Sequence, residues 1–493
     1  MDVTLLAADA VKDAISKGCD EAEVFIKTAK RFSVEVKNNG VEALNSAKDF
    51  GISLRVIKNH RLGFSFTTNP ESSGLEDMVR EAVEGAKWTA EDKYIDIPSL
   101  PPFNSPLTKG GYRGVKGGLV GVASSEALVF DEKIESMKEN DVINNALFLE
   151  KTALDFDSRI KKVRKAEVAL ASGSTTIFSS KGIKVSYDSS SITASVTTLA
   201  DDGHDMQTGW DFAVSRRLSD IDFGSIAEAA SKKAIDLLGS RKIISVRIPV
   251  ILDSSVASDF LGIFSSSLSA EAVQKKRSFL ANKIGKNIIS PIVNIFDDGL
   301  MPWRIGTKPV DDEGVPTSKK MIVSKGALTG FIHNTYTAKK EGTVSTGNAV
   351  RGGFKTLPGV GVTNLYIEPK PPSLVIARDE VPKQSYSFGA VPKDGIASPS
   401  ARNDRLVKSV SKGILVLEAM GVHTANPISG DFSVGISGLW IENGEIKYPI
   451  KEAVMSGNVL ELFKRIERVG SDLKFYGKIG SPSLLIGEMD ISA

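Results

Sequence analysis

The sequence predicts an α+β protein: an N-terminal α/β domain with a mainly antiparallel sheet, followed by a β-rich C-terminal domain that is sandwich-like or barrel-like. The chain has 493 residues, which exceeds what one hydrophobic core usually organises, so two or more domains are expected. Helical and alternating patterns share the first half, whereas short apolar runs between Gly, Pro, Asn and Asp dominate the second. We place the domains at residues 1–240 and 246–493.

The N-terminal residues predict a helix, strands and a second helix. Apolar residues from Val3 to Ile15 recur at helical spacing, and Gly18 stands where a left-handed residue would end the helix. Apolar and polar residues then alternate, as in strands, over residues 22–26, 32–36 and 52–56. The sequence Asn38-Asn39-Gly40 predicts a turn before the last of these strands. A second helix is expected over residues 75–88.

Further elements are expected before the domain boundary, which we place near residues 240–245. They are a Gly- and Pro-rich surface excursion over residues 101–121, a helix from Leu147 to Phe156, and several strands over residues 166–198 around Gly173 and Lys181-Gly182. One more helix is predicted to begin where Ser225 and Glu228 have the spacing of a capping box, and to end at Gly239.

From Val246 onward the sequence is typical of a β-rich domain. The apolar runs that we expect to form strands are Ile248–Leu252, Ile289–Ile295, Leu374–Ile376, Gly413–Leu417 and Val434–Ile441. The sequence Glu442-Asn443-Gly444-Glu445 predicts a hairpin turn. Helices are expected only near residues 255–270 and 458–469.

Composition and charge narrow the class of protein. The formal net charge is +2, which provides no large field for a phosphate backbone or an anionic lipid surface. No apolar run approaches the roughly 18 residues that a membrane span needs, and the acidic N-terminus does not resemble a signal peptide. Cys19 is the single cysteine, which is consistent with a reducing compartment. We therefore expect a cytoplasmic protein that binds neither nucleic acid nor membrane directly.

The most informative stretch is residues 330–351, which we call the signature segment. It begins GFIHNTYTAKKEGTVSTGN and places many polar and small residues between strand-like segments, which predicts a built loop with its own hydrogen bonds. Its Asn, Thr and Tyr side chains could bind an extended peptide backbone. The same side chains could instead pin a long connection to its own domain, and both alternatives stay open.

The signature segment resembles that of the TldD/PmbA family, whose TldE/PmbA branch carries a similar HNxYTA and STGNA pattern. The sequence GVHTANPISGDFS at residues 421–433 is similar to the same branch, and GCDEAEV at 18–24 and DEGVPT at 312–317 match the family more broadly. These segments identify the following candidates for peptide contact: His333, Asn334, Thr335, Tyr336, Ser345, Thr346, Asn348, Arg351 and His423.

The resemblance also implies where a metal site would be. The catalytic branch of the family is a zinc metalloprotease with an H-E-x-x-x-H helix, and matching residues 278–286 to the segment after that helix places the ligand positions at Leu261, Gly262 and Ser266. None of these side chains can bind zinc. The four histidines, at positions 60, 204, 333 and 423, include no pair at the spacing of a metal helix. We expect no cofactor in this chain and zinc in a partner subunit.

Other patterns that carry chemistry have simpler interpretations. The run Ser265-Ser266-Ser267 lacks a nucleophile elbow and predicts a packed helix face. The acids Asp311-Asp312-Glu313 could bind a cation, but such a sequence more often forms a solvated turn. A metal site assembled from His333, His423 and distant carboxylates remains geometrically possible.

The family resemblance implies a TldE/PmbA-like subunit without a metal site of its own. Such a subunit would work with a TldD-like zinc protease subunit, as a homodimer or heterodimer, on unfolded or modified peptides, and would be inactive alone. One rival interpretation is an autonomous metallopeptidase or other hydrolase with an unrecognised site. Another is a non-enzymatic modulator of DNA gyrase, because a near-neutral chain can still bind a protein.

Overall fold

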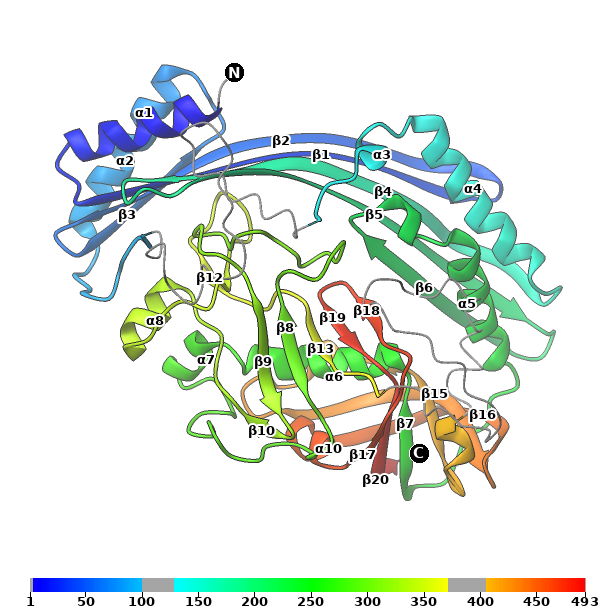
Figure 1. Ribbon diagram of the computed structural model, residues 1–493. Coiled ribbons are helices and arrows are strands. Elements are labelled where there is room, and N and C mark those ends of the chain that lie inside the picture. The colour runs from blue at the N-terminus through cyan, green and yellow to red at the C-terminus, as the bar shows by residue number, and fades with distance from the viewer. Residues whose placement is uncertain (1–2, 100–127, 371–404, 493) are drawn as a thin grey trace, which may run out of the picture.

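A long antiparallel sheet arches over the C-terminal half of the chain (Figure 1). The structure is a computed structural model that describes residues 3–99, 128–370 and 405–492. Within these ranges the arched sheet has six strands in the order β3-β2-β1-β4-β5-β6. Their bounds are β1 Glu21–Lys37, β2 Gly40–Lys58, β3 Arg61–Thr67, β4 Ile160–Ser179, β5 Lys184–Asp201 and β6 Met206–Ser215.

The strands of this sheet are longer than the sequence pattern predicts. The turn between β1 and β2 is confirmed: Asn38 and Asn39 have positive φ angles of 55° and 58°, as a tight hairpin turn with right-handed strand twist requires. Gly173 does not separate two strands but lies inside β4, where an added Cβ would come within 2.1 Å of the Thr28 carbonyl oxygen. Close contact between neighbouring strands therefore explains this glycine.

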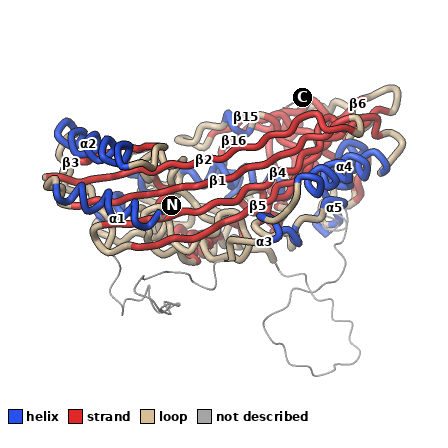
Figure 2. Tube along the Cα trace, turned by 90° about the horizontal axis from the view of Figure 1, so that it is seen from above, coloured by secondary structure: helices blue, strands red, loops and turns tan. Residues whose placement is uncertain are grey.

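Helices cover the two ends of the convex face of the arched sheet (Figures 1 and 2). The bounds of these helices are α1 Val3–Ser16 and α2 Ser72–Trp88 at one end, and α3 Glu132–Glu135, α4 Glu139–Asp155 and α5 Phe223–Asp236 at the other. Each end has its own apolar core, which includes Val24 and Leu54 beneath α2, and Val34 and Val168 beneath α4. The predicted helices are confirmed, but the expected capping box is wrong: α5 is capped by Asp222, whose side chain accepts from the Ser225 N–H.

The C-terminal half contains a closed barrel. Its strands are β7 Val246–Leu252, β14 Lys412–Met420, β15 Asp431–Glu442, β16 Glu445–Asn458 and β20 Leu484–Ser492. The order β16-β15-β14-β7-β20 closes because β16 also pairs with β20, which selects the barrel over the sandwich. The β15–β16 hairpin confirms the turn predicted at Asn443-Gly444. Strand β17, Ile466–Val469, pairs with the first residues of β20, Leu484–Ile486.

A second sheet lies between the barrel and the arched sheet, in the order β10-β9-β8-β13-β19-β18. Its strands are β8 Ile295–Asp298, β9 Lys319–Ser324, β10 Ala327–Leu328, β13 Leu365–Ile367, β18 Lys474–Tyr476 and β19 Ile479–Ser481, and a separate pair is formed by β11 Ala349–Val350 and β12 Gly359–Val360. Helix α6, Ser254–Ser266, packs between the barrel and this sheet through contacts with β14 and β19. Phe260 and Phe264 of α6 are fully buried there.

The remaining elements are short. They are α7 Ala270–Gln274, α8 Thr335–Glu341, α10 Val459–Lys464, and the 3-10 turns η1 Leu218–Asp220 and η2 Val422–Thr424. Two expected helices are therefore too long: the first ends at Ser266 and restarts as α7, and the second ends at Lys464 and continues as β17.

Some expected strands have other outcomes. The run Ile289–Ile295 is mostly loop, and only its last residue enters β8. The excursion expected at 101–121 and the strand expected at Leu374–Ile376 lie outside the described residues.

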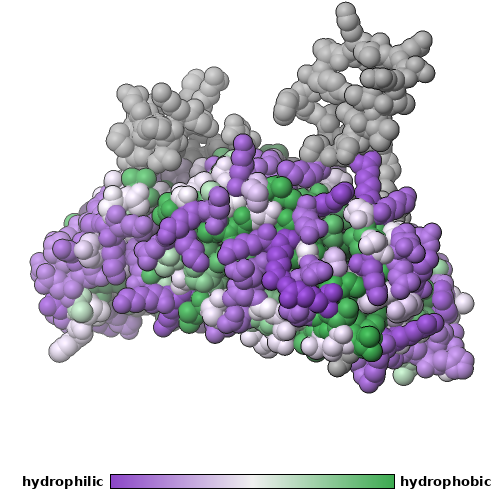
Figure 3. All heavy atoms as spheres, turned by 90° about the horizontal axis from the view of Figure 1, so that it is seen from below, coloured by the Kyte–Doolittle hydropathy of each residue, from purple (hydrophilic) through white to green (hydrophobic). Residues whose placement is uncertain are grey.

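The surface on the side of the barrel is mostly polar. Figure 3 shows the face opposite the arched sheet, where hydrophilic side chains predominate and apolar ones form small patches. None of the described helices is long and apolar enough to cross a membrane.

Candidate functional site

The first part of the signature segment forms a short helix, where its composition predicts a loop. Helix α8 begins after Asn334, whose side chain accepts a hydrogen bond from the Thr337 N–H at 2.9 Å. Asparagine is favoured at this position because its side chain satisfies an N–H group that has no partner inside the helix. Gly342 ends α8 with a left-handed φ of 72°. Asn334 is 4% exposed, and its amide also donates to the Pro358 carbonyl at 3.2 Å.

The residues after α8 hold the segment in place. The Thr346 hydroxyl accepts from the His333 N–H at 2.7 Å and donates to the Asn348 Oδ1 at 2.8 Å. Asn348 is fully buried, and its amide donates to Asp297 at 2.8 Å and to a backbone carbonyl at 2.9 Å. The Ser345 hydroxyl donates to the His333 carbonyl at 3.3 Å. For Ser345, Thr346 and Asn348, these internal contacts favour a structural role, in which the side chains hold the segment to its own domain, over binding of a peptide.

The acidic turn beneath the segment is buried, where a solvated turn was expected. Asp311, Asp312 and Glu313 are 2%, 5% and 0% exposed. The Asp311 carboxylate accepts backbone N–H groups of its own turn and of β11, each at 2.9 Å. Asp312 accepts from the Arg351 N–H at 2.8 Å and Glu313 from the Thr335 N–H at 2.9 Å. These buried hydrogen bonds reach both α8 and β11, so this turn organises the signature segment.

The pKa values of Asp311 and Asp312 shift in opposite directions. Burial and the neighbouring Glu313 carboxylate raise the pKa of Asp311 to about 8. The backbone N–H groups that donate hydrogen bonds to Asp311 act in the opposite direction but do not outweigh burial. Burial also acts to raise the pKa of Asp312, but the Lys308 ammonium at 2.6 Å outweighs it and lowers that pKa. Each carboxylate oxygen of the turn already accepts a hydrogen bond from the protein. None of these carboxylate oxygens is therefore left without a hydrogen bond, which argues against cation binding by this turn.

A buried charge network joins the turn to the arched sheet. It consists of Glu23, Arg55, Glu313 and Arg351. Arg55 on β2 contacts Glu23 on β1 at 2.8 Å and Glu313 at 2.9 Å, and Arg351 contacts the other Glu23 oxygen at 2.5 Å. The four side chains are at most 8% exposed. Burial alone would lower the pKa of Arg55, but Glu23 and Glu313 raise it. The network thus places two acids and two arginines in direct ion-pair contact away from water.

A cavity of about 290 Å³, which we call the α8 cavity, lies beside this network. Its walls combine apolar side chains, including Ile57 and Leu357, with the acids Asp92 and Glu271. The Tyr336 hydroxyl donates to Asp92 at 2.8 Å. A concave site with apolar walls and a few oriented polar groups is typical of ligand binding. Two candidate residues, Asn334 and Tyr336, therefore lie at the wall of this cavity. Tyr336 makes one side-chain hydrogen bond there, to Asp92.

The histidines and Thr335 occupy different environments. Burial lowers the pKa of His333, with partial opposition from Glu341, whose carboxylate lies 4.0 Å from Nε2. The His333 Nδ1 and the Thr335 Oγ1 are buried and have no hydrogen-bond partner within the part of the chain that the structure describes. His423 is exposed and lies on η2, an element that contacts β15 and α6. A search of the same described residues finds no group of three or more His, Cys, Asp or Glu side chains placed to hold a metal ion.

The side chains of α6 do not fit a zinc ion at the positions implied by the resemblance. Leu261 is fully buried in the core, Gly262 has no side chain, and the exposed Ser266 donates its hydroxyl to the Ile263 carbonyl at 2.8 Å. Zinc requires imidazole, thiolate or carboxylate ligands. No chemistry of this chain can therefore be derived through a zinc ion on α6.

Sequence reasoning missed three residues of this site: Glu23, Arg55 and Asp92. Glu23 and Arg55 alternate with apolar residues along their strands, so the pattern places them on a solvent face. Their partners lie far along the chain: Glu313 is 258 positions from Arg55, and Tyr336 is 244 positions from Asp92. No local signal in the sequence could have identified them.

Models of the PmbA/TldA metallopeptidase family match domain 1 at residues 22–86, the central domain at 131–238 and the C-terminal domain at 245–493. A curated relative, the metalloprotease PmbA homolog of Buchnera aphidicola, is 28% identical over 474 residues, which cover 95% of this chain and 92% of the relative.

Solved structures share the whole fold. A putative modulator of a DNA gyrase from Thermotoga maritima has a TM-score of 0.82 and 25% identity, with 99% of both chains covered. TldE from Thermococcus kodakarensis has a TM-score of 0.81 over 99% of this chain and 100% of its own, and its 20% identity supports the fold alone. Because the C-terminal family model alone spans half of the 493 residues, the chain belongs to the PmbA/TldD family.

Proposed function

We propose that this chain is the metal-lacking subunit of a TldD/TldE-type zinc metalloprotease that degrades or trims unfolded or modified peptides. The observation that carries the proposal is the chemistry of α6, where Leu261, Gly262 and Ser266 occupy the positions of the expected zinc ligands. The similarity to a protein named as a PmbA homolog supports the same subunit type. The metal is then supplied by a TldD-like partner.

The α8 cavity is the surface of this subunit that we propose to contact peptide. Tyr336 and Asp92 supply a hydroxyl and a carboxylate at its wall, and apolar side chains such as Leu357 offer a surface for side chains of the peptide. Among the candidate residues, Asn334 and Asn348 instead stabilise the segment that carries Tyr336. In this proposal, peptide binding and structural support are therefore roles of different residues in the same segment.

Reconstitution tests the subunit proposal. The chain is purified alone and together with a TldD-branch protein from the same organism, and cleavage of reduced casein is measured with and without a chelator. We expect no cleavage and less than stoichiometric zinc for the chain alone, and chelator-sensitive cleavage for the pair. Chelator-sensitive cleavage by the chain alone, or one zinc per chain that is lost on replacing His333 or His423, contradicts the proposal.

A matched set of variants tests the peptide surface. Tyr336→Phe removes the hydroxyl that contacts Asp92 at the partly exposed wall, so we expect unchanged melting and reduced cleavage by the pair. Asn348→Ala removes fully buried hydrogen bonds and should lower the melting temperature, because each lost buried bond costs about 1–3 kcal/mol. Normal cleavage by a stably folded Tyr336→Phe pair removes the support for the cavity as a peptide site.

A further inference from the structure

Four cationic side chains surround the loop at residues 305–308, which contacts both the arched sheet and the second sheet. We call them the interior cations: Lys27, Arg216, Lys308 and Lys478. Lys308 belongs to the loop, and Arg216, which follows β6, donates to the Ile305 carbonyl at 2.9 Å. The Gly306 N–H donates to Asn364 at 2.9 Å. The next residue, Leu365 of β13, donates its N–H at 2.9 Å to the carbonyl of Lys478 in the turn between β18 and β19.

Lys27 reaches this group from the inner face of β1, where its ammonium donates to the Thr175 hydroxyl at 2.8 Å. Burial and then Lys308 lower the pKa of Lys27 to about 8. Arg216 adds to this shift, and Asp312 opposes it. Burial also lowers the pKa of Lys478, again together with Lys308 and Arg216. Electrostatic effects in salt solution fade over about 10 Å, so these shared effects agree with the contacts that place the interior cations together.

One interior cation has an acidic partner within residues 3–99, 128–370 and 405–492. Lys308 contacts Asp312 at 2.6 Å. In the same ranges, Lys27 donates to a hydroxyl, Arg216 donates to backbone carbonyls, and Lys478 makes no ion pair. With a pKa of about 8, Lys27 is mostly protonated at pH 7. An anion held among these side chains would therefore relieve their mutual repulsion.

The other acid that acts on Lys478 is already occupied. Asp297 is fully buried, and its carboxylate accepts from Asn348 at 2.8 Å and from the Thr363 N–H at 2.6 Å. Lys320 lies 3.3 Å from the same carboxylate. Lys478 is exposed, and Lys27 and Lys308 are partly exposed. Solvent therefore reaches the interior cations, and a dissolved anion can do so as well.

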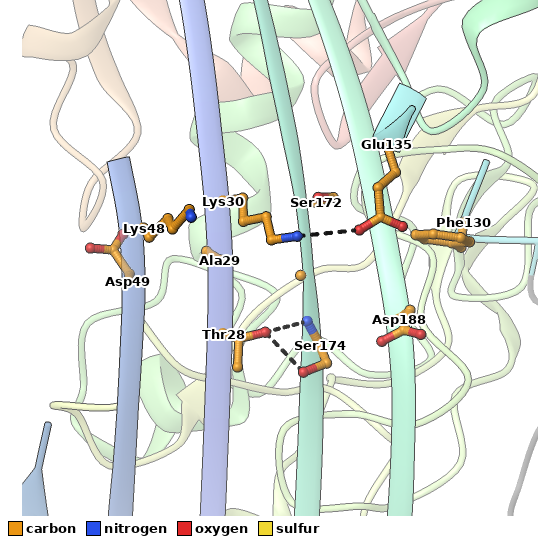
Figure 4. Close-up of a pocket in the computed structure, with 11 residues that line it drawn as sticks. Thr28, Ala29, Lys30, Lys48, Asp49, Phe130, Glu135, Ser172, Ser174 and Asp188 are labelled. Atoms are coloured by element: carbon orange, nitrogen blue, oxygen red, sulfur yellow. Dashed lines mark hydrogen bonds and ion pairs between the residues drawn. The ribbon is translucent and has the colours of Figure 1, made fainter. Parts of the chain in front are cut away.

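The outer face of the same sheet has a different balance of charge. Lys30 lies three positions after Lys27 on β1, so it points to the opposite face. Figure 4 shows it at a cavity of about 320 Å³, directed toward Glu135 at 3.8 Å, with Asp188 also at the wall. Lys30 thus has an acid within reach, and it provides a matched control for Lys27.

We propose that the interior cations bind a carboxylate of a peptide, either its C-terminal carboxylate or an acidic side chain. Ammonium groups form charge-assisted hydrogen bonds with carboxylates, and a recess lined by one sign of charge concentrates ligands of the other sign. This inference rests on the proposed function, because it names the peptides that the subunit holds: those that carry a negative charge. The interior cations are distinct from the residues that line the α8 cavity.

Titration calorimetry of the isolated chain tests the preference for a carboxylate. The probes are three decapeptides of Gly, Ser and Ala with acetylated N-termini. The first has a central Gln and an amidated C-terminus, the second has a central Glu and the same amide, and the third has a central Gln and a free C-terminal acid. We expect the second or the third to bind about tenfold tighter than the neutral first peptide at low salt. Comparison of those two identifies the source of the carboxylate.

Charge removal tests which side chains bind the carboxylate. Lys27→Gln and Lys478→Gln should each weaken binding of the preferred acidic peptide by about fivefold to tenfold, and should leave the neutral peptide unchanged. Lys30→Gln removes a lysine from the opposite face of β1 and should keep the original preference. Neither Lys27 nor Lys478 has an ion pair to lose in the described ranges, so the melting temperatures of these variants should not fall.

Several outcomes overturn the proposal. They are equal or absent binding of the three peptides, an unchanged preference in the double variant Lys27→Gln with Lys478→Gln, and an equal loss in Lys30→Gln. Binding of inorganic phosphate without binding of either acidic peptide also overturns it, because the cations would then hold an adventitious ion only. Failure of the proposed subunit role has a different signature, chelator-sensitive cleavage by the chain alone, which these binding measurements do not involve.

Discussion

At the scale of single residues, the charge network is the feature with the largest expected energetic weight. Arg55 lies between Glu23 and Glu313, and all three side chains are at most 8% exposed. A buried pair adds little net stability compared with apolar packing, but removing one partner leaves an uncompensated charge in the interior. Arg351 still neutralises part of Glu23, so Glu313 is the group that depends most on Arg55.

Replacing Arg55 should therefore destabilise the protein strongly. We expect Arg55→Met to lower the free energy of unfolding by about 3–5 kcal/mol, because it leaves the Glu313 carboxylate buried without a cation. Urea unfolding measures the change. Lys87→Ala is the matched control: it removes an exposed ion pair with Glu84 and should change stability by less than about 1 kcal/mol. Equal effects of the two variants would contradict the assignment of the network.

His333 should make stability depend on pH. Burial holds its pKa in the folded protein below the ordinary value of about 6.5, so the unfolded chain takes up a proton that the folded chain resists. This contribution is present above about pH 6.5 and is lost as pH falls through the folded pKa. His333→Gln should therefore lose less stability than the original between about pH 7 and pH 5. Thermal melts across this range test it, with the exposed His204→Gln expected to keep the original slope.

At the scale of elements, close contact between α2 and β3 depends on the absence of a side chain. An added Cβ at Gly63 of β3 would come within 1.9 Å of the Ala82 carbonyl oxygen of α2. Gly85, on the same helix, has no atom within 4 Å of the corresponding position. The two glycines therefore have different roles: Gly63 permits the packing distance, whereas Gly85 only weakens the helix.

The same substitution at these two positions should have opposite effects. Gly63→Ala forces the helix away from the sheet and is expected to cost about 1–3 kcal/mol of stability. Gly85→Ala fills open space and should stabilise by about 0.5–1 kcal/mol, because alanine has the higher helix propensity. Differential scanning calorimetry of both variants measures the signs, and a destabilising Gly85→Ala would show that this side of α2 is covered.

At the scale of the whole molecule, buried polar contacts connect the arched sheet to the C-terminal half. Arg216 follows β6 directly in the sequence, and its guanidinium donates to the carbonyls of Arg304 and Ile305 at 3.2 and 2.9 Å. Lys474 of β18 contacts both oxygens of Asp211 on β6 at 2.8 Å. With the charge network and a small apolar cluster in which Val310 packs with Ile177 and Ile183, these contacts join two regions whose largest apolar cores are separate. We therefore expect the regions to unfold together.

Calorimetry tests this coupling. The original chain should unfold in a single transition, whereas Arg216→Leu should separate it into two, because the freed carbonyls of the second region lose buried partners. Arg159 provides a control within the arched-sheet region: its side chain is 45% exposed and pairs with Asp157, so Arg159→Leu should retain one transition. Two transitions in the original chain would show that the regions are energetically independent.

The sequence by itself determined the elements whose signals are local. The helix that ends near Gly18, the Asn38-Asn39-Gly40 turn and the Asn443-Gly444 hairpin follow from side-chain periodicity and from positive φ angles that few residues tolerate. The family pattern in the signature segment was likewise visible in the sequence, as was the lack of zinc-binding side chains at Leu261, Gly262 and Ser266.

Only the tertiary structure decided which of these polar residues are buried. Asp311 to Glu313 resemble a solvated turn because no neighbour in sequence supplies their partners, yet Glu313 pairs with Arg55 at a separation of 258 positions. Closure of the barrel likewise depends on β16 meeting β20. Such pairings depend on how the whole chain packs, and a charged residue in an alternating strand has the same pattern whether it faces water or a distant opposite charge.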